Sequence, residues 1–194
     1  MLSRRAGNQV CFYLTLKMLY FLLLLMSFDQ PSSNILFDFQ PHSDLSKWVV
    51  VNDGVMGGIS SGRLYLDNEG HGVFEGQVRL EYNGGFSSIR LPLKQMAITG
   101  YQKLRIRLKG DGKRYQVRVK SDRDDYQSYI AYIETSGKWE VVEIDLSAMY
   151  PTFRGRQLSM PNFPEKVLGE VGILIGNKKA EAFRLELDYI RLDK

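Results

Sequence analysis

The pentapeptide Gly58-Ile59-Ser60-Ser61-Gly62 is the stretch whose spacing comes nearest to a catalytic motif. It matches G-x-S-x-G, in which a serine on a strained turn between a strand and a helix acts as a nucleophile. Here a strand-like pattern follows, and neither His42 nor His71 lies late in the chain, where the partner histidine is expected. We therefore interpret the motif as a glycine-rich loop and predict a protein that is not an enzyme, with no catalytic residue.

Side chains that could bind a metal ion are few and poorly spaced. Asp122, Asp124 and Asp125 could offer oxygen ligands to calcium, but the glycine that an EF-hand loop requires does not follow them. Two histidines and the single Cys11 give no spacing typical of zinc. We predict no metal and no cofactor, and the sequence leaves open a structural calcium held by loop carbonyl groups.

A basic set of side chains, Arg105, Arg107, Arg118 and Lys120, alternates with apolar residues on two predicted strands. The set could bind an anionic partner. Alternatively it forms a solvated face, neutralised by an acidic strand such as the one that carries Glu186 and Asp188. We favour the second interpretation.

Composition and charge point to an ordinary soluble domain. A hydrophobic content of 44% and a charged content of 25% are typical of globular proteins. The formal net charge is +4, but Arg4, Arg5 and Lys17 lie near the N-terminus, so the rest of the chain is close to neutral. We therefore predict no nucleic-acid partner.

Residues 1–33 differ in pattern from the rest of the chain. Basic residues precede a short apolar run, residues 18–26, which is typical of a signal peptide or membrane anchor but short for a spanning helix. A linker follows at residues 30–34. We expect export or membrane association on the periplasmic side rather than a cytoplasmic location, with membrane contact only through this segment. The alternatives are an unstructured tail or a later start at Met18 or Met26.

The remaining residues, 34–194, predict a single all-β domain. Short strand-like runs recur between turn residues, with no long helical pattern and no internal repeat. Such spacing is typical of a two-sheet β-sandwich. The runs lie at 35–39, 48–51, 63–66, 73–78, 86–91, 104–109, 115–120, 126–133, 139–146, 171–175 and 183–192.

The same alternation predicts how some strands pair. The runs on either side of Gly110-Asp111-Gly112 should form one hairpin, and those on either side of residues 135–137 a second. The continuous apolar run 171–175 indicates a central strand buried on both faces. A change of parity before Ile190 indicates a bulge or an edge. Residues 150–164, which contain proline and glycine, are expected to form a loop.

The aromatic residues allow two interpretations, either a platform on which sugars stack or simply core. We expect Trp139, which lies in an alternating run, to be in the core. Phe153 and Tyr150, which lie in the predicted loop, are better candidates for the surface. The set considered is Trp48, Tyr115, Tyr129, Trp139 and Phe153.

The loop from Asn52 to Gly62 is the most distinctive stretch of the chain. It begins Asn52-Asp53-Gly54-Val55-Met56-Gly57-Gly58-Ile59-Ser60, which combines an acid, a Val-Met pair and a double glycine. Glycines let the backbone approach a neighbour closely, and a methionine can pack adaptably on a partner. The loop therefore either contacts a partner or locks the edge of the sandwich.

This loop resembles the characteristic motif of the complex I intermediate-associated protein 30 family, and ordered matches continue downstream. They span nearly the whole predicted domain, from Ile35 to Leu192, and the chain looks like a bacterial-type member. The matches are Gly84-Gly85-Phe86-Ser87-Ser88-Ile89-Arg90, Gly110-Asp111-Gly112-Lys113-x-Tyr115, Tyr129, Trp139, Pro151-Thr152-Phe153-Arg154-Gly155-Arg156, the stretch from Gly172 to Gly176, and Phe183-x-Leu185.

The resemblance implies a galactose-binding-like jelly roll, similar to some carbohydrate-binding modules. It implies a chaperone-like assembly factor that binds unfolded protein and helps to build NADH:ubiquinone oxidoreductase, complex I. The expected partner is then a protein, such as a respiratory complex subunit or an assembly intermediate. The alternative is an exported carbohydrate-binding module-like domain with a carbohydrate as its partner. The residues that we expect to bind are Asn52, Asp53, Val55, Met56, Gly57, Gly58, Ser60, Arg90, Phe153 and Arg154.

Overall fold

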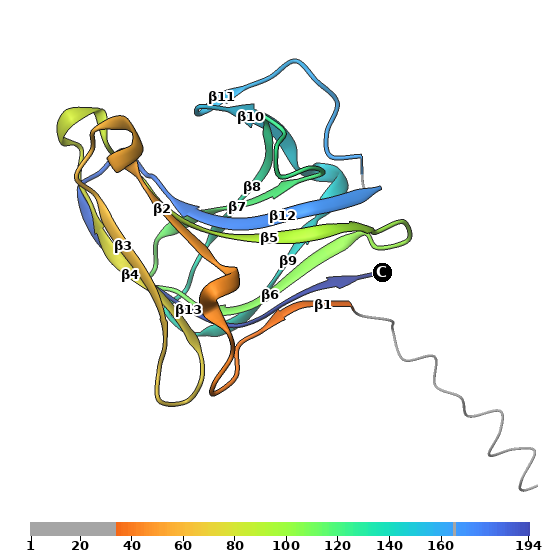
Figure 1. Ribbon diagram of the computed structural model, residues 1–194, viewed down its shortest axis with the longest axis horizontal. Helices are drawn as coiled ribbons and strands as arrows, with labels where there is room; N and C mark the ends of the chain where they lie inside the picture. The colour runs from red at the N-terminus through yellow and green to blue at the C-terminus, as the bar shows by residue number, and fades with distance from the viewer. Residues whose placement is uncertain (1–33, 165) are drawn as a thin grey trace, which may run out of the picture. The chain divides into compact units, whose positions relative to one another are not determined.

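Two antiparallel β-sheets pack face to face in the computed structural model (Figure 1). The structure describes residues 34–164 and 166–194, without the side chains of Val55 and Asn83. Within these residues no helix combines the length and the apolar character needed to cross a membrane. The predicted signal peptide or anchor at residues 1–33 lies outside the described residues.

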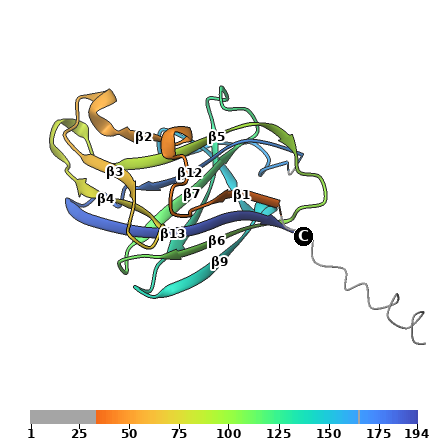
Figure 2. The same ribbon diagram turned by 60° about the horizontal axis from the view of Figure 1, so that its bottom comes forward.

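Thirteen strands in the described residues divide between the two sheets. Sheet A has the order β3 (Ser61–Leu66), β4 (Gly72–Val78), β13 (Glu181–Asp193), β6 (Lys103–Lys109) and β9 (Trp139–Asp145), and β1 (Asn34–Asp38) also pairs with β13. Figure 2 brings this sheet forward, with β13 running through its middle. Sheet B has the order β11 (Arg156–Gln157), β10 (Tyr150–Phe153), β8 (Ser128–Glu134), β7 (Arg114–Lys120), β12 (Val167–Ile175), β5 (Ser87–Ala97) and β2 (Val49–Asn52).

Only short 3-10 helices accompany the strands within the described residues. They are η1 (Leu45–Lys47), η2 (Asp53–Met56), η3 (Glu81–Asn83) and η4 (Leu146–Ala148). The predicted all-β, two-sheet sandwich is therefore confirmed.

Alternating strands supply the core between the sheets. On β6 the side chains of Leu104, Ile106 and Leu108 are fully buried, and the basic residues between them face outward. On β7 of the opposite sheet, Val117 and Val119 are buried in the same way. Burying an aliphatic side chain stabilises the fold by about 1.5–3 kcal/mol, so the alternation decides which face of each strand meets the other sheet.

The two predicted hairpins are wrong in their pairing. β6 lies in sheet A between β13 and β9, whereas β7 lies in sheet B between β12 and β8, so residues 110–113 form a corner between the sheets. Likewise β8 belongs to sheet B and β9 to sheet A. The alternation reports which face of a strand is buried and not which strand lies beside it, and glycine-marked turns serve hairpins and corners alike.

Two other predictions on individual strands are confirmed, and one is wrong. β12 lies inside sheet B with residues 171–175 all buried, and β13 shifts register between Leu187 and Tyr189, which is the expected bulge. Trp139, however, is half-buried on the outer face of sheet A. Its ring lies 4.6 Å from that of His71 and 4.9 Å from the Arg107 guanidinium. The register pairs Trp139 with an outward-facing position of β6 and not with an inward one.

Residues 150–164 contain a strand pair where a simple loop was predicted. β10 and β11 form a hairpin through Arg154 and Gly155. Both turn residues have positive φ, 48° and 75°, which is the combination that a two-residue type I′ turn requires. The sequence concealed this hairpin because Pro151 and Gly155 are typical of loops. Figure 1 shows β10 and β11 rising away from the rest of sheet B.

Candidate functional site

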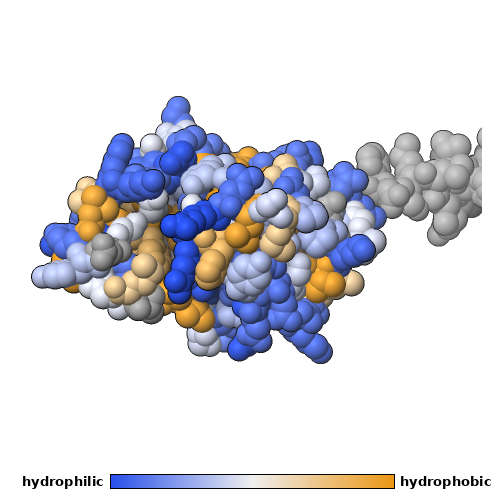
Figure 3. Space-filling view, turned by 90° about the horizontal axis from the view of Figure 1, so that it is seen from above, coloured by the Kyte–Doolittle hydropathy of each residue, from blue (hydrophilic) through white to orange (hydrophobic). Residues whose placement is uncertain are grey.

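A cleft of about 670 Å³ lies on the outer face of sheet B. Strands β5, β7, β8 and β12 form its floor, the loops around Met56 and Phe86 form one wall, and the β10–β11 hairpin forms the other. Figure 3 looks onto this side of the domain and shows a band of hydrophilic side chains with hydrophobic ones on both sides. The volume lies in the range of about 300–1,000 Å³ that is typical of ligand sites.

One row of residues crosses the floor of this cleft from strand to strand. The register places Arg90 of β5 and Arg118 of β7 on either side of Gly172 in β12. Because neighbouring strands are about 4.8 Å apart, the two arginine backbones are about 10 Å from each other. A Cβ added to Gly172 would lie 3.5 Å from Cγ of Arg90, so the Arg90 stem lies against the glycine. Val49 continues the row beyond Arg90, and Ile130 continues it beyond Arg118.

Arg90 and Arg118 form no salt bridge with a carboxylate within the described residues. The salt bridges there are formed by other lysine and arginine side chains. Burial lowers the pKa of Arg118 below its ordinary value, and the positive charge of Arg90 lowers it further, whereas Glu170 acts in the opposite direction. An arginine stays charged in a protein. The desolvated charge of Arg118 is therefore left largely uncompensated by its surroundings.

Two other polar side chains on the floor, Lys120 and Gln116, already have partners. Lys120 Nζ donates to the carbonyl oxygens of Arg123 at 3.0 Å and Asp125 at 2.6 Å. Gln116 Nε2 donates to Tyr132 Oη at 2.9 Å. The two arginines differ from Lys120 and Gln116 in having no side-chain hydrogen bond within the described residues.

Aromatic and sulfur-containing side chains form the wall on the side of the β10–β11 hairpin. The rings of Tyr126 and Phe153 meet edge to face with their centroids 5.4 Å apart, and Tyr126 Oη donates to Met160 Sδ at 3.5 Å. The Arg154 guanidinium lies 5.3 Å from the centre of the Phe153 ring. Tyr126 is 60% exposed and Met56, on the opposite wall, is also 60% exposed. Both walls therefore offer apolar surface to a ligand.

Asp53, in the loop before β3, is buried and ties two loops together. Its Oδ1 accepts from the N–H of Ser60 at 2.9 Å, and its Oδ2 accepts from the N–H groups of Gly85 at 2.6 Å and Phe86 at 3.4 Å. Burial acts to raise the pKa of Asp53, but the hydrogen bonds from Ser60, Gly85 and Phe86 outweigh it and hold the pKa below its ordinary value. A Cβ on Gly58 would clash with this carboxylate, so the glycine is required there.

Ser60 has the hydrogen bonds of a structural residue. Its Oγ donates to the carbonyl of Arg79 at 3.1 Å and accepts from the N–H of Arg79 at 2.9 Å. Strand β3 begins at the next residue, so the strand–turn–helix geometry of a nucleophile elbow is not formed. Nearby, Asn52 Oδ1 accepts from Ser87 Oγ at 2.6 Å.

The residues expected to bind therefore separate into two groups. Four line the cleft, namely Met56, Arg90, Phe153 and Arg154. Five belong to the loop itself, and these are Asn52, Asp53, Gly57, Gly58 and Ser60. Gly57 ends η2 with a φ of 89°, and the other four hold the loop in shape. The side chain of Val55 is not described. Sequence reasoning did not single out the cleft residues Gln116, Tyr126, Tyr132 and Leu174.

A signal for two of these missed residues exists in the strand alternation. Gln116 shares the outward parity of Arg118 on β7, and Tyr132 shares that of Ile130 on β8. Because parity alone does not say which outward faces belong to one sheet, Gln116 and Tyr132 could not be grouped.

The described residues hold no group of three or more His, Cys, Asp or Glu side chains that could hold a metal ion. In the acidic turn, Asp122 accepts from the N–H of Asp124 at 2.9 Å and from Gln95 Nε2 at 2.7 Å. Asp125 accepts from the N–H of Asp122 at 3.1 Å. These carboxylates thus serve the turn itself, as expected of a solvated turn.

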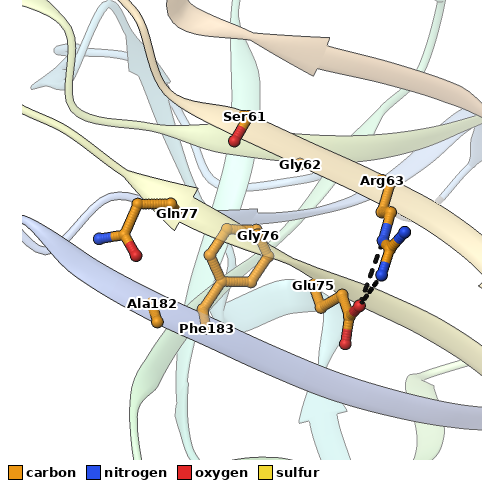
Figure 4. A pocket seen from close by; sticks show the side chains of 8 residues that line it. All are labelled: Ser61, Gly62, Arg63, Glu75, Gly76, Gln77, Ala182 and Phe183. Carbon is orange, nitrogen blue, oxygen red and sulfur yellow. Dashed lines mark hydrogen bonds and ion pairs between the residues drawn. The ribbon is translucent and has the colours of Figure 1, made fainter.

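A second hollow, of about 490 Å³, lies on the outer face of sheet A (Figure 4). Its two charged lining residues, Arg63 and Glu75, form a salt bridge of 2.6 Å. Glu75 also pairs with Arg184 at 2.6 Å. This hollow therefore presents a neutralised surface, unlike the cleft on sheet B.

Comparison with solved structures identifies the fold. The domain is similar to the family 11 carbohydrate-binding module of the cellulosomal cellulase Lic26A-Cel5E of Clostridium thermocellum, with a TM-score of 0.62 and 14% identity over 85% of this chain and 96% of that one. It is also similar to the family 11 module from the same organism in complex with a β-1,3-1,4-mixed-linked tetrasaccharide, with a TM-score of 0.59 and 16% identity over 83% and 95% of the two chains. The jelly-roll, galactose-binding-like fold implied by the sequence motifs is confirmed by this likeness.

Comparison by sequence finds two curated relatives with the same description. The chain is 25% identical to the mitochondrial complex I intermediate-associated protein 30 of Drosophila melanogaster, and 22% identical to that of Mus musculus. The alignments cover 87% and 81% of this chain but only 66% and 55% of the relatives, so the chain spans less than two thirds of their length. A family model described as Complex I intermediate-associated protein 30 (CIA30) matches residues 37–187, and the chain belongs to this family.

Proposed function

We propose that this chain is a non-catalytic binding protein that receives a segment of a partner protein in the cleft on sheet B, as an assembly factor for complex I. The cleft is the observation that carries the proposal, because two apolar walls and a floor with unpaired donors are features of a recognition site. Family membership supports the class of partner, since the two relatives are named for their association with a complex I intermediate.

The proposal depends on the site and not on the fold alone, because one fold hosts many functions. The family model covers residues 37–187, which include every element that forms the cleft. Ser60, the residue nearest to a catalytic motif, uses its hydroxyl in hydrogen bonds to the backbone of Arg79. This supports binding without chemistry as the activity of the domain.

Affinity capture with the full chain in its native host tests this function. We expect the wild type to capture subunits of NADH:ubiquinone oxidoreductase. A double variant, Met56→Ser with Phe153→Ser, should lose them, because both side chains are exposed on opposite walls of the cleft. The matched control is Val141→Ser, which removes a similarly exposed apolar side chain from the outer face of sheet A. Capture that survives the double variant, or an intact complex I in a strain that lacks the protein, would contradict the proposal.

A second candidate is carbohydrate binding. It is favoured by the fold shared with a module solved in complex with a tetrasaccharide, and by the exposed ring of Tyr126 beside the cleft. Calorimetry with the β-1,3-1,4-mixed-linked tetrasaccharide would detect binding, and Tyr126→Ala should abolish it. The absence of heat at about 1 mM sugar would remove this candidate.

The location of the protein is a separate proposal. We propose that residues 1–33 direct the protein to export or to the periplasmic side of a membrane rather than to the cytoplasm, because basic residues precede a short apolar run. Fractionation of cells followed by N-terminal sequencing tests this. A mature chain that begins after the apolar run would support export, and a full-length cytoplasmic chain would contradict it.

A further inference from the structure

We propose that the floor of the cleft is a carboxylate-binding subsite, in which Arg90 and Arg118 together bind an aspartate or glutamate side chain of an acidic partner segment. The inference rests on the proposed function in one respect, namely that the cleft receives part of a protein. It goes beyond that function by naming the chemistry that the partner must present.

The first argument is the missing partner of each arginine. On sheet A, Arg105 pairs with Asp193 at 2.6 Å and Lys109 pairs with Glu186 at 3.3 Å. Within the described residues, Arg90 and Arg118 form no salt bridge, although Arg118 is partly buried and burial lowers its pKa. A desolvated charge without a partner destabilises a fold. A pair of such charges in one cleft is the arrangement expected of a site whose counter-charge arrives with the ligand.

The second argument is the geometry around Gly172. The glycine lies between the two arginines in the register and has no side chain of its own to separate them. Both guanidinium groups can therefore turn toward the space above Gly172. A carboxylate has two oxygens and about four acceptor positions, so it can accept hydrogen bonds from two guanidinium forks at once.

The third argument concerns what surrounds the pair. Ile130 continues the arginine row beyond Arg118, and Leu174 lies next to the row on β12. Met56 and Phe153 lie on the walls. A neutral sugar would leave both positive charges unmatched, whereas an acidic residue with apolar neighbours would match the charge and cover the walls. The occupant that fits is therefore a short protein segment in which one acidic residue lies among apolar ones.

Peptide display against the immobilised full chain tests this directly. We expect selection from random heptapeptides to enrich aspartate or glutamate next to aromatic or aliphatic residues. Binding of the enriched peptides should weaken as NaCl is raised from about 50 mM to about 500 mM, because part of the attraction is ionic. Enrichment of basic or uncharged peptides, or no enrichment, would overturn the proposal.

Variants of the two arginines locate the site. Arg90→Gln and Arg118→Gln should each weaken binding of the enriched peptides by about tenfold or more. Arg118→Lys should give a smaller loss, because it keeps the charge but not the planar fork. Arg63→Gln, an arginine on the outer face of sheet A, is the matched control and should bind as the wild type does. Unchanged affinity in the double variant Arg90→Gln, Arg118→Gln would overturn the proposal.

Two further measurements separate this inference from the proposed function and from other ligands. Thermal unfolding of Arg118→Gln should show a midpoint equal to or above that of the wild type, so a loss of binding cannot be assigned to a loss of folding. If capture of complex I subunits requires Met56 and Phe153 but not the arginines, the function stands and the carboxylate subsite is wrong. If acidic peptides bind through the arginines while no complex I subunit is captured, the reverse holds. Preferential binding of oligogalacturonate over acidic peptides would also overturn the choice of a protein segment.

Discussion

The outer faces of the two sheets carry the same alternating pattern of basic residues, but these residues form salt bridges on sheet A and lack them at Arg90 and Arg118 on sheet B. On sheet A, Arg105 meets Asp193 and Glu143, and Arg107 meets Asp188. On sheet B, Arg90 and Arg118 have a glycine between them, and no described residue forms a salt bridge with either. The neighbouring strand, and not the pattern within a strand, therefore decides whether the basic residues of a face form salt bridges or remain available to a ligand.

The origin of the difference is the composition of the two central strands. β13 presents Glu186 and Asp188 beside β6, so the basic residues of β6 find carboxylates in the next strand. β12 presents Gly172 at the corresponding place beside β7. Glu170 lies two residues away and only partly offsets the charge of Arg118.

The largest effect that we predict comes from a fully satisfied charge, Asp53. Asp53→Asn should lower the free energy of unfolding by about 3 kcal/mol, because a buried carboxylate with three N–H donors is replaced by an amide that cannot accept from all of them. Urea denaturation measures this loss. A loss well below 1 kcal/mol would mean that the loop does not depend on these hydrogen bonds.

The Asp53 variant also has a signature in pH. The folded-state pKa of Asp53 lies below its ordinary value, so its contribution to stability is present above about pH 4 and is lost as the pH falls through the folded pKa. The difference in stability between wild type and Asp53→Asn should therefore be largest at neutral pH and shrink below about pH 4. A difference that is independent of pH would show that the carboxylate charge is not the cause.

The next effect has the opposite sign. Arg118→Leu should raise the free energy of unfolding by an amount on the order of 1 kcal/mol, because a desolvated charge with no salt bridge is replaced by an apolar side chain beside Ile130. Urea denaturation in the absence of ligand measures it. Destabilisation instead would mean that Arg118 is held by favourable contacts within the protein, as the arginines of sheet A are.

A smaller effect is expected on the paired face. Asp188→Asn should lower the free energy of unfolding by about 0.5 kcal/mol, because it removes the partner of Arg107 in a bridge that is partly open to solvent. A double-mutant cycle with Arg107→Gln isolates the pair. A coupling free energy of zero would show that the carboxylates of sheet A neutralise the face without stabilising it.

The smallest effect belongs to an exposed arginine on the outer face of sheet A. Arg63→Gln should leave the midpoint of thermal unfolding unchanged, because an exposed ion pair with Glu75 is screened by water and salt. Differential scanning calorimetry at low and high salt checks this. A clear fall in the midpoint at low salt would show that the Arg63–Glu75 ion pair in the hollow on sheet A stabilises the fold.

The sequence predicted which face of each strand is buried, but it did not predict which strands lie next to each other. The alternation of Leu104, Ile106 and Leu108 gave the correct buried face of β6, and the parity change gave the bulge in β13. Pairing failed at residues 110–113 because a glycine-marked corner has the same local signal as a hairpin turn. The inward or outward position of Trp139 depended on a register that only its partner strand defines.

The candidate site was predictable only in part, for a related reason. The loop from Asn52 to Gly62 was singled out as unusual. The N–H groups that donate to the Asp53 carboxylate, however, include those of Gly85 and Phe86, which lie more than 30 residues away in the sequence. Arg118 and Arg105 look alike in sequence, and they differ only because their sheets differ. Such contacts between distant segments are what local patterns do not contain.

The position of β13 at the centre of sheet A has a consequence for synthesis of the protein. β13 pairs with β1, β4 and β6, all of which leave the ribosome long before it does. A nascent chain that ends before residue 181 has no strand to join β4 to β6, so sheet A, and with it the lid of the core beneath the cleft, cannot close. Closure of sheet A therefore follows translation of β13, and until then β4 and β6 lack the strand that lies between them.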